Sequence, residues 1–292
     1  PRIPTTSGAA TYREIISWLE GRGPFDAIGV ATFGPVDVRR GAPTYGLVQA
    51  PNKPHGGWED FSILATLRAA FGDETPILVD NDANANLRAE VVYGCGRDES
   101  VRSVYFIING GGTGGALGLK TEGYPRIVTG SSFDTEIGST LVALHDDDRS
   151  RYRAHFEPRL HVGGLVRAED VMAHDSFARR RGREAREVPV GDATWDAVAF
   201  YAAQLCNHVL SLAAPDRVVF AGGIALGEGF DLHRVAEHIV AMNSCGGGGF
   251  IPPLRDLDAV RGLLRKSALG GDVGVYGALT LAREAALSRS YC

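Results

Sequence analysis

Apolar residues recur every three or four positions in the first twenty residues and then gather in short continuous runs. Tyr12, Ile15 and Leu19 would share one face of a helix, and Gly21 would end it. A run such as 76–79 is instead typical of a buried strand. Because strands and helices alternate, the pattern predicts an α/β fold. The elements expected here are a helix at 12–19, a strand at 27–31, a helix at 64–71, a strand at 76–79 and a helix at 83–93.

The pattern changes near residue 100, and a first domain boundary is expected at 94–101. A strand at 104–108 runs into a glycine-rich segment, and a second strand at 116–119 returns, which predicts a hairpin. Residues 145–190 are irregular and charged, and the arginine run at 179–181 suits a solvated helix face. The later elements expected are a long helix at 195–212, a strand at 217–220 and a final helix at about 272–287.

Composition narrows the class of protein. The net charge of −5 argues against a general nucleic-acid binder, because such a surface must meet phosphate charge. No apolar run reaches the ~18 residues of a membrane span, and the residues that follow Pro1 show no basic-then-apolar pattern of a secretory signal. The 4 cysteines lie far apart, so we expect no paired zinc or redox site and a reducing cytoplasm. Glycine supplies 38 of the 292 residues in clusters, which suggests backbone brought close to a ligand.

The glycine-rich segment 109–115 is a candidate phosphate site. Gly110, Gly112 and Gly115 satisfy the spacing GxGxxG, but a dinucleotide fold requires a helix to follow, and the sequence predicts a returning strand. A glycine-rich hairpin can still present successive backbone N–H groups to a phosphate. The alternative is a tight turn that uses glycine for its positive φ.

Two further segments lie where strands end. A carboxylate in Asp80-Asn81-Asp82 could accept a hydroxyl proton, and Asn81 could orient that hydroxyl; alternatively, one of the aspartates caps the following helix. The backbone at Gly222-Gly223 could lie against a flat ring, and a simple turn is the alternative there.

In their order along the chain, these segments resemble those of ROK-family sugar kinases, within the fructokinase-like branch. The resemblance covers nearly the whole chain. It implies an actin-like (ribonuclease H-like) α/β fold of two domains with a cleft between them. The first domain would be 1–100, completed by 272–292, and the second 101–271. ATP would lie mainly on the second domain and the sugar between the two. The segments that carry the resemblance are 28–35, 43–46, 79–84, the glycine-rich hairpin, 136–138, 194–195, 217–223 and 268–278.

The resemblance also implies an activity and roles for particular residues. The reaction would transfer the γ-phosphoryl group of ATP, with Mg²⁺, to a hexose, most simply fructose to give fructose 6-phosphate. The enzyme would be a cytoplasmic homodimer with no nucleic-acid or membrane partner. The implied roles are Asp82 as general base, Asn81, Glu136, Gly34 and Pro35 at the sugar, Gly110, Gly112, Gly114 and Gly115 at the phosphates, and Gly222 and Gly223 on the adenine side.

The chain departs from the family pattern at several positions. Its first residues, 2–6, resemble the strand that follows the family's first phosphate loop, and Gly111 and Gly163 stand where the family has a hydroxyl residue and a sugar-contacting glutamate. Ser139 replaces a zinc-ligating histidine. His145, His155 and His161 are the remaining zinc candidates, but their spacing does not require a site, so we predict a metal-free loop. The alternative to an active kinase is a degenerate paralogue that binds sugar or nucleotide or serves as a structural protein. A repressor is disfavoured, because no helix-turn-helix precedes the region.

Overall fold

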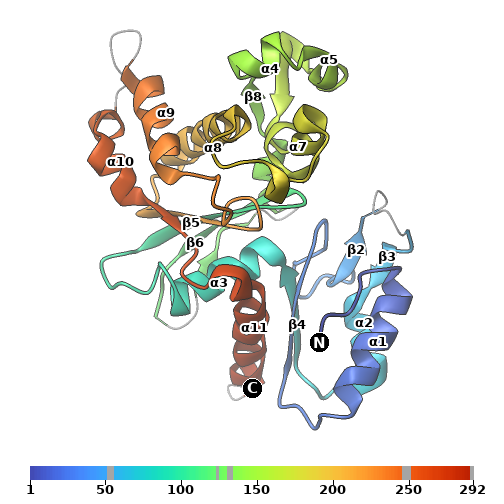
Figure 1. Ribbon diagram of the computed structural model, residues 1–292. Helices are drawn as coiled ribbons and strands as arrows, with labels where there is room; N and C mark the ends of the chain where they lie inside the picture. The colour runs from blue at the N-terminus through green and yellow to red at the C-terminus, as the bar shows by residue number, and fades with distance from the viewer. Residues whose placement is uncertain (51–55, 123–124, 130–133, 245–250, 290–292) are drawn as a thin grey trace. The chain divides into compact units, whose positions relative to one another are not determined.

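The computed structural model describes residues 1–50, 56–122, 125–129, 134–244 and 251–289 (Figure 1). The chain divides into two compact units. Along the chain, the first boundary between the units falls inside a helix, between Ala89 and Glu90, whereas the sequence pattern predicted a boundary at 94–101. The first unit is Pro1–Ala89, Thr129–Asp134 and Gly274–Cys292, and the second is Glu90–Val128 and Thr135–Val273.

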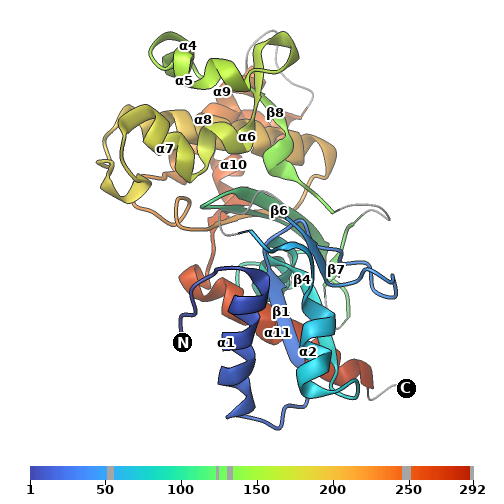
Figure 2. The same ribbon diagram turned by 90° about the vertical axis from the view of Figure 1, so that its right-hand side faces the viewer.

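A pair of parallel strands forms the centre of the first unit. The strands β1 and β4 run in register from Ile28 beside Ile77 to Thr32 beside Asn81. Helices α1 and α2 lie on one side of this pair and α11 on the other (Figures 1 and 2). The elements are α1 (Gly8–Glu20), β1 (Ile28–Thr32), β2 (Leu47–Gln49), β3 (Glu59–Ser62), α2 (Ile63–Phe71), β4 (Ile77–Asn81), α3 (Asp82–Tyr93, which continues into the second unit) and α11 (Val273–Arg289).

Local sequence explains how these elements pack. The Ser7 hydroxyl accepts a hydrogen bond from the Ala10 N–H at the start of α1, and Gly21 follows its last residue. Tyr12 of α1 and Leu67 of α2 are buried in one core with the strand residues. At Gly29 a Cβ atom would lie 2.0 Å from the Ala278 carbonyl oxygen, so the glycine lets the backbone of α11 rest on β1. The helices and strands expected from the apolar pattern are confirmed here, whereas residues 2–6, which resemble a strand of the family, form no strand.

A five-stranded sheet forms the base of the second unit, in the order β11-β10-β5-β6-β7. Strand β10 runs parallel to β5 and β11, whereas β5, β6 and β7 are antiparallel neighbours. The predicted hairpin is therefore confirmed. The strands of this unit are β5 (Ser103–Asn109), β6 (Thr113–Leu119), β7 (Arg126–Ile127), β10 (Arg217–Ala221) and β11 (Leu264–Lys266), with a separate antiparallel pair β8 (Leu141–Ala143) and β9 (Leu165–Arg167).

Helices α8, α9 and α10 lie over one face of this sheet (Figures 1 and 2). Alternate strand residues such as Tyr105, Ile107 and Phe220 belong to the same core as Leu205 of α8 and Ile239 of α9. Among the described residues, no helix combines the length and apolarity needed to cross a membrane. The helices are α4 (Asp146–Ser150), α5 (Arg153–Phe156), α6 (Ala168–Met172), α7 (His174–Arg181), α8 (Ala193–Leu212), α9 (Leu232–Ser244) and α10 (Leu257–Leu263). The 3₁₀ turns are η1 (Ile137–Ser139), η2 (Glu157–Arg159), η3 (Val162–Gly164), η4 (Ala185–Glu187), η5 (Pro252–Arg255) and η6 (Gly270–Asp272).

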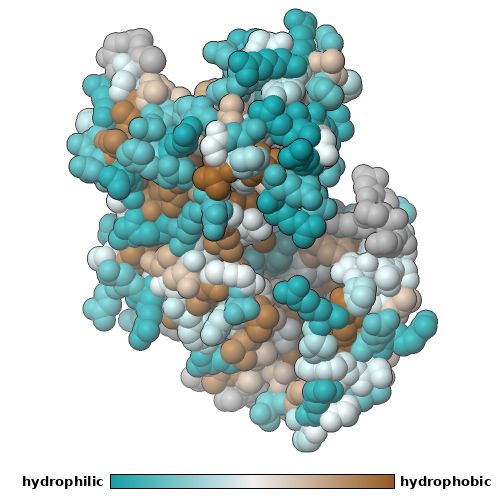
Figure 3. All heavy atoms as spheres, in the orientation of Figure 1, coloured by the Kyte–Doolittle hydropathy of each residue, from teal (hydrophilic) through white to brown (hydrophobic). Residues whose placement is uncertain are grey.

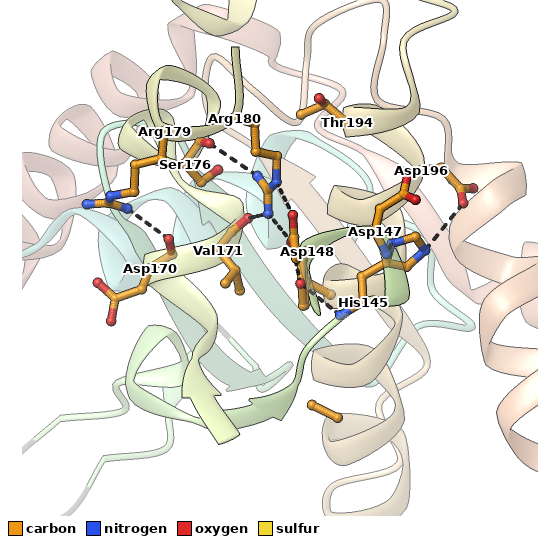
Figure 4. Close-up of polar contacts among 12 residues, drawn as sticks. His145, Asp147, Asp148, Asp170, Val171, Ser176, Arg179, Arg180, Thr194 and Asp196 are labelled. Atoms are coloured by element: carbon orange, nitrogen blue, oxygen red, sulfur yellow. Dashed lines mark hydrogen bonds and ion pairs between the residues drawn. The ribbon is translucent and has the colours of Figure 1, made fainter. Parts of the chain in front are cut away.

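The charged segment 145–190 contains short helices with largely hydrophilic outer surfaces (Figure 3). Its arginine run, however, is not a uniformly solvated face, and Arg180 corrects that prediction. The Arg180 guanidinium is fully buried and donates two hydrogen bonds, of 2.8 and 2.6 Å, to the equally buried Asp148 carboxylate (Figure 4). It also donates to the Val171 carbonyl, and the Tyr201 hydroxyl donates to Asp148 at 2.5 Å. Burial and the neighbouring Asp148 charge raise the pKa of Tyr201, which keeps the hydroxyl protonated as a donor.

Replacing Arg180 tests how far the second unit depends on this ion pair. Arg180→Leu leaves the Asp148 carboxylate buried without its cation, so we expect a loss of about 3–5 kcal/mol in the free energy of unfolding. Arg153→Leu is the control, because Arg153 and its partner Glu157 are both exposed and such pairs contribute less than about 1 kcal/mol. Urea unfolding followed by circular dichroism measures both. Equal unfolding midpoints for the two variants would contradict a stabilising role for the buried pair.

Candidate active site

The predicted catalytic segment lies where β4 ends and α3 begins. The Asn81 side-chain oxygen accepts a 2.7 Å hydrogen bond from the Asn84 N–H, which is the N-cap arrangement for α3. The cap is therefore an asparagine rather than one of the flanking aspartates. Asp82 is the first residue of the helix, and its carboxylate accepts the Ala83 N–H at 2.8 Å. Asp82 is half-buried at the start of the helix, a position where the helix dipole favours a carboxylate.

A polar network lies beneath Asn81 and Asp82. The Asn84 amide donates one hydrogen bond to Asp80 at 2.8 Å and another to Asp134 at 2.6 Å. The Asn81 amide also donates to Asp134. Both ends of the Asn81 side chain are thus engaged, one as the helix cap and the other against Asp134.

Ion pairs extend this network to α11. Arg88 of α3 lies 3.4 Å from the Asp80 carboxylate and 3.0 Å from that of Glu284, and Arg40 pairs with Glu284 at 2.8 Å. Burial raises the pKa of Asp80, and the Arg88 charge opposes that rise. Through these contacts, α3 and α11 hold the end of β4 in place. Gly34 and Pro35 follow β1, the strand beside β4, and the Pro35 carbonyl accepts the Gln49 N–H at 2.9 Å.

The glycine-rich segment forms a tight hairpin tip in the second unit. Residues 110–112 connect β5 to β6, and the Gly110 N–H donates to the Gly112 carbonyl at 2.9 Å. No helix follows, in keeping with the rejection of a dinucleotide motif. At Gly115 a Cβ atom would lie 2.8 Å from the Ile137 side chain, so packing alone requires glycine there. Gly114 lies opposite Ile108 in the ladder. At Gly111 no atom lies within 4 Å of the Cβ position.

Asn109 joins the hairpin to the Gly222-Gly223 turn. Asn109 is fully buried, and its carbonyl accepts the Ile224 N–H at 3.1 Å. Gly222 has φ +93°, and a Cβ atom there would lie 2.4 Å from the Asn109 carbonyl oxygen. A Cβ atom on Gly110 would lie 3.6 Å from the Gly223 nitrogen. The two glycine segments predicted to bind nucleotide therefore lie against each other.

Segments from 135–174 support the same hairpin. The exposed Glu169 carboxylate accepts the Thr113 N–H at 3.0 Å, beside Gly112. The Gly110 carbonyl accepts the His174 N–H at 2.9 Å. Glu136 is exposed just before η1, which packs on the hairpin because Gly138 leaves room for the Thr113 backbone. Glu136 therefore lies near the hairpin at 110–115, the predicted phosphate loop of the second unit.

A cavity of about 530 Å³ opens beside the later residues of the same turn, Glu228–Leu232. Phe230, Arg234 and Lys266 line it together with Val190 and Gly191. The Lys266 ammonium donates to the Gly227 carbonyl at 3.0 Å and lies 5.9 Å from the centre of the Phe230 ring. Burial lowers the pKa of Lys266.

The zinc candidates occupy separate positions. His145 accepts the Asp147 N–H as the cap of α4 and lies 3.7 Å from Asp196. His155 packs near the Tyr152 ring, and the His161 N–H donates to the Leu165 carbonyl. In the part of the chain that the structure describes, no group of three or more histidine, cysteine, aspartate or glutamate side chains could hold a metal ion.

The described cysteines are not activated thiols. Cys206 is fully buried, and burial raises the pKa of its thiol. Burial raises the pKa of the Cys95 thiol to about 11. Cys245 and Cys292 lie outside the described residues.

Sequence reasoning missed Asn109, Asp134 and Glu169. Asn109 carried a signal, since it is a polar residue at the end of an apolar strand directly before the glycines. Glu169 and Asp134 meet their partners only through the fold, 56 and 53 residues away in the chain.

Comparison with known proteins identifies the family to which the chain belongs. Residues 13–285 match the ROK family. This chain belongs to the ROK family. The resemblance inferred from its ordered segments is confirmed, including the likeness to proteins named fructokinase.

Curated relatives and solved structures cover most of this ROK-family chain. It is 28% identical to the fructokinase of Pediococcus pentosaceus over 284 residues, which are 97% of this chain and 88% of that protein. It is 27% identical to the Zymomonas mobilis fructokinase over 233 residues, 76% of this chain and 71% of that protein. The ROK hexokinase of Thermus thermophilus superposes with a TM-score of 0.68 at 21% identity, covering 100% of this chain and 91% of that one.

A second structural neighbour is a ROK-family glucokinase from Streptomyces griseus, solved with glucose and AMPPNP. It has a TM-score of 0.68 at 19% identity and covers 96% of this chain and 89% of that one. These likenesses confirm the expected actin-like α/β fold.

The two adjacent glycines of the turn should respond differently to substitution. Gly222→Ala forces a side chain into a positive-φ position against the Asn109 backbone, so we expect a loss of at least about 1–3 kcal/mol in stability. Gly223→Ala meets no atom within 4 Å and should change stability by less than about 0.5 kcal/mol. Chemical denaturation of both variants measures the difference. If both lost the same stability, the close approach at Asn109 would not be what fixes this turn.

Proposed function

We propose that this ROK-family chain is an ATP-dependent sugar kinase that phosphorylates a hexose, with fructose giving fructose 6-phosphate. The observation that carries the proposal is the contact between the hairpin tip at Gly110 and the Gly222-Gly223 turn, which brings both predicted nucleotide segments together. The names of the Pediococcus and Zymomonas relatives support fructose as the acceptor. The glucose and AMPPNP bound to the Streptomyces neighbour support a hexose and a nucleoside triphosphate as the pair of substrates.

Asp82 is the proposed general base. Its carboxylate accepts the proton of the sugar hydroxyl while the hydroxyl oxygen attacks the γ-phosphorus. The bond from that phosphorus to the β–γ bridging oxygen breaks, and ADP leaves with the electron pair. Asn81 and Glu136 hydrogen-bond the sugar hydroxyls in this proposal, and Gly34 and Pro35 contribute backbone beside the strand end.

The hairpin and the turn form the proposed nucleotide side. The tip of the hairpin around Gly111 faces the phosphates in this proposal, because the Gly110 and Thr113 N–H groups are already bonded to Gly112 and Glu169. The Gly222-Gly223 backbone lies against the base. The neighbouring cavity has the size and the Phe230, Arg234 and Lys266 side chains to take part of a nucleoside.

Mg²⁺ is expected to bind with the nucleotide. It is usually held by one or two carboxylates together with substrate phosphates, so a cage made by the protein alone is not needed. The Glu169 carboxylate, which accepts the Thr113 N–H at the hairpin, offers oxygen donors of that kind. When bound, the ion neutralises charge on the phosphoryl groups. A cytoplasmic homodimer remains a prediction from the family resemblance.

Asp82→Asn tests the catalytic assignment. We expect kcat for hexose phosphorylation to fall by about 10²–10⁴-fold, because the amide cannot accept the proton, while sugar and AMPPNP affinities stay near those of the unchanged protein. Asp73→Asn is the control, because its side chain is exposed and lies two residues beyond the end of α2. A coupled ADP-release assay and calorimetry provide the readouts. Near-normal turnover in Asp82→Asn would remove it from the mechanism; sugar binding without turnover by the unchanged protein would favour the degenerate paralogue.

Alanine at Gly111 or Gly223 tests the nucleotide side. Both positions are open, so neither change should disturb the fold. A methyl group between backbone and phosphate or base should weaken Mg²⁺–AMPPNP binding by about tenfold or more, since a charged hydrogen bond contributes about 1.5–3 kcal/mol. Gly262→Ala in α10 is the matched open-space control. Calorimetric affinities equal to that of the control would exclude these glycines from the nucleotide site.

A further inference from the structure

The Asp134 carboxylate accepts hydrogen bonds from two side-chain amides next to Asp82, the proposed catalytic base. Asn81 and Asn84 both direct their side-chain N–H groups to the same Asp134 oxygen. Asp134 belongs by its contacts to the first unit, although Thr135 and Glu136, which follow it, belong to the second. The fold therefore delivers a carboxylate to the strand end from a distant part of the sequence.

These contacts fix the orientation of the Asn81 amide. Its oxygen is engaged by the Asn84 N–H and its nitrogen donates to Asp134, so rotation of the amide by 180° would break both hydrogen bonds. The nitrogen carries a second hydrogen, which makes Asn81 a donor toward an incoming group. An oriented donor beside a general base suits the oxygen of a sugar hydroxyl.

We propose that Asp134 is a positioning residue for sugar binding, which holds Asn81 as a hydrogen-bond donor next to Asp82. This role rests on the proposed function. Hydrogen bonds to a charged acceptor are about twice as strong as neutral ones, so the carboxylate holds the amide more firmly than water would.

The contacts described for the strand end include several that do not involve Asp134. The cap of α3 is the Asn81 oxygen, and Asn84 keeps its second hydrogen bond to Asp80 when Asp134 is changed. Asp80 itself stays paired with Arg88. Substitution of Asp134 should therefore affect the orientation of Asn81 while leaving the strand end and the helix in place.

The test compares Asp134→Ala, Asp134→Asn and the control Asp73→Ala in the full chain. Asp134→Ala removes the acceptor, and we expect both the KM and the calorimetric Kd for the hexose to rise about tenfold, with KM for ATP within twofold and the thermal midpoint unchanged. Asp134→Asn keeps an oxygen that can accept both amides and should recover most of the sugar affinity. Asp73 has a side chain that is 87% exposed, and its replacement should change none of these values.

Three results would overturn the inference. If the unchanged protein phosphorylates the hexose and Asp134→Ala binds that sugar within twofold of the normal affinity, the role of Asp134 is wrong while the proposed function stands. A parallel loss of sugar affinity, ATP affinity and thermal stability would show that Asp134 serves the fold and not the sugar. If the unchanged protein bound no hexose and transferred no phosphate to one, the proposed function and this inference would fall together.

Discussion

The candidate nucleotide site depends on one close approach between backbone segments, at Asn109. Its carbonyl receives the N–H of Ile224, and its side-chain amide donates to the Met172 carbonyl at 3.1 Å while the oxygen accepts from Thr113. Gly222 can approach this peptide only because it has no side chain. A fully buried asparagine that uses its carbonyl, its amide and its side-chain oxygen has little freedom to move. The hairpin, the turn and the α6–α7 junction are therefore fixed by the same residue.

The first unit uses buried charge instead of close backbone contact. Asp80 and Arg88 are both buried, and each would be costly to desolvate alone. Glu284 supplies the second anion that Arg88 needs, so α11, at the far end of the sequence, takes part in holding the end of β4. An ion-pair network of this kind contributes little net stability compared with apolar packing, but it tolerates few alternative arrangements. That restriction is useful beneath Asn81 and Asp82, where a small displacement would move the proposed base.

The sequence predicted features that arise locally and missed those that arise from distant partners. Periodicity located the helices near Tyr12 and Trp195, because spacing along one face is a local property. The glycine clusters marked the hairpin and the turn for the same reason. Arg180 was assigned to a solvated face because its partner Asp148 lies 32 residues away, and only the fold shows that both are buried. Asp134 has no local signal either, since its role comes from Asn81, 53 residues earlier.

The glycines of the candidate site fall into two groups with different physical causes. Gly115, Gly138 and Gly222 are required by the protein itself, because a Cβ atom at each would lie within 2.8 Å of a neighbour. Gly111 and Gly223 have no such neighbour, and neither has a positive φ. The fold therefore gives no packing or conformational cause for glycine at these two positions. A ligand approaching the bare backbone supplies one, and both glycines lie in the segments proposed to bind the nucleotide.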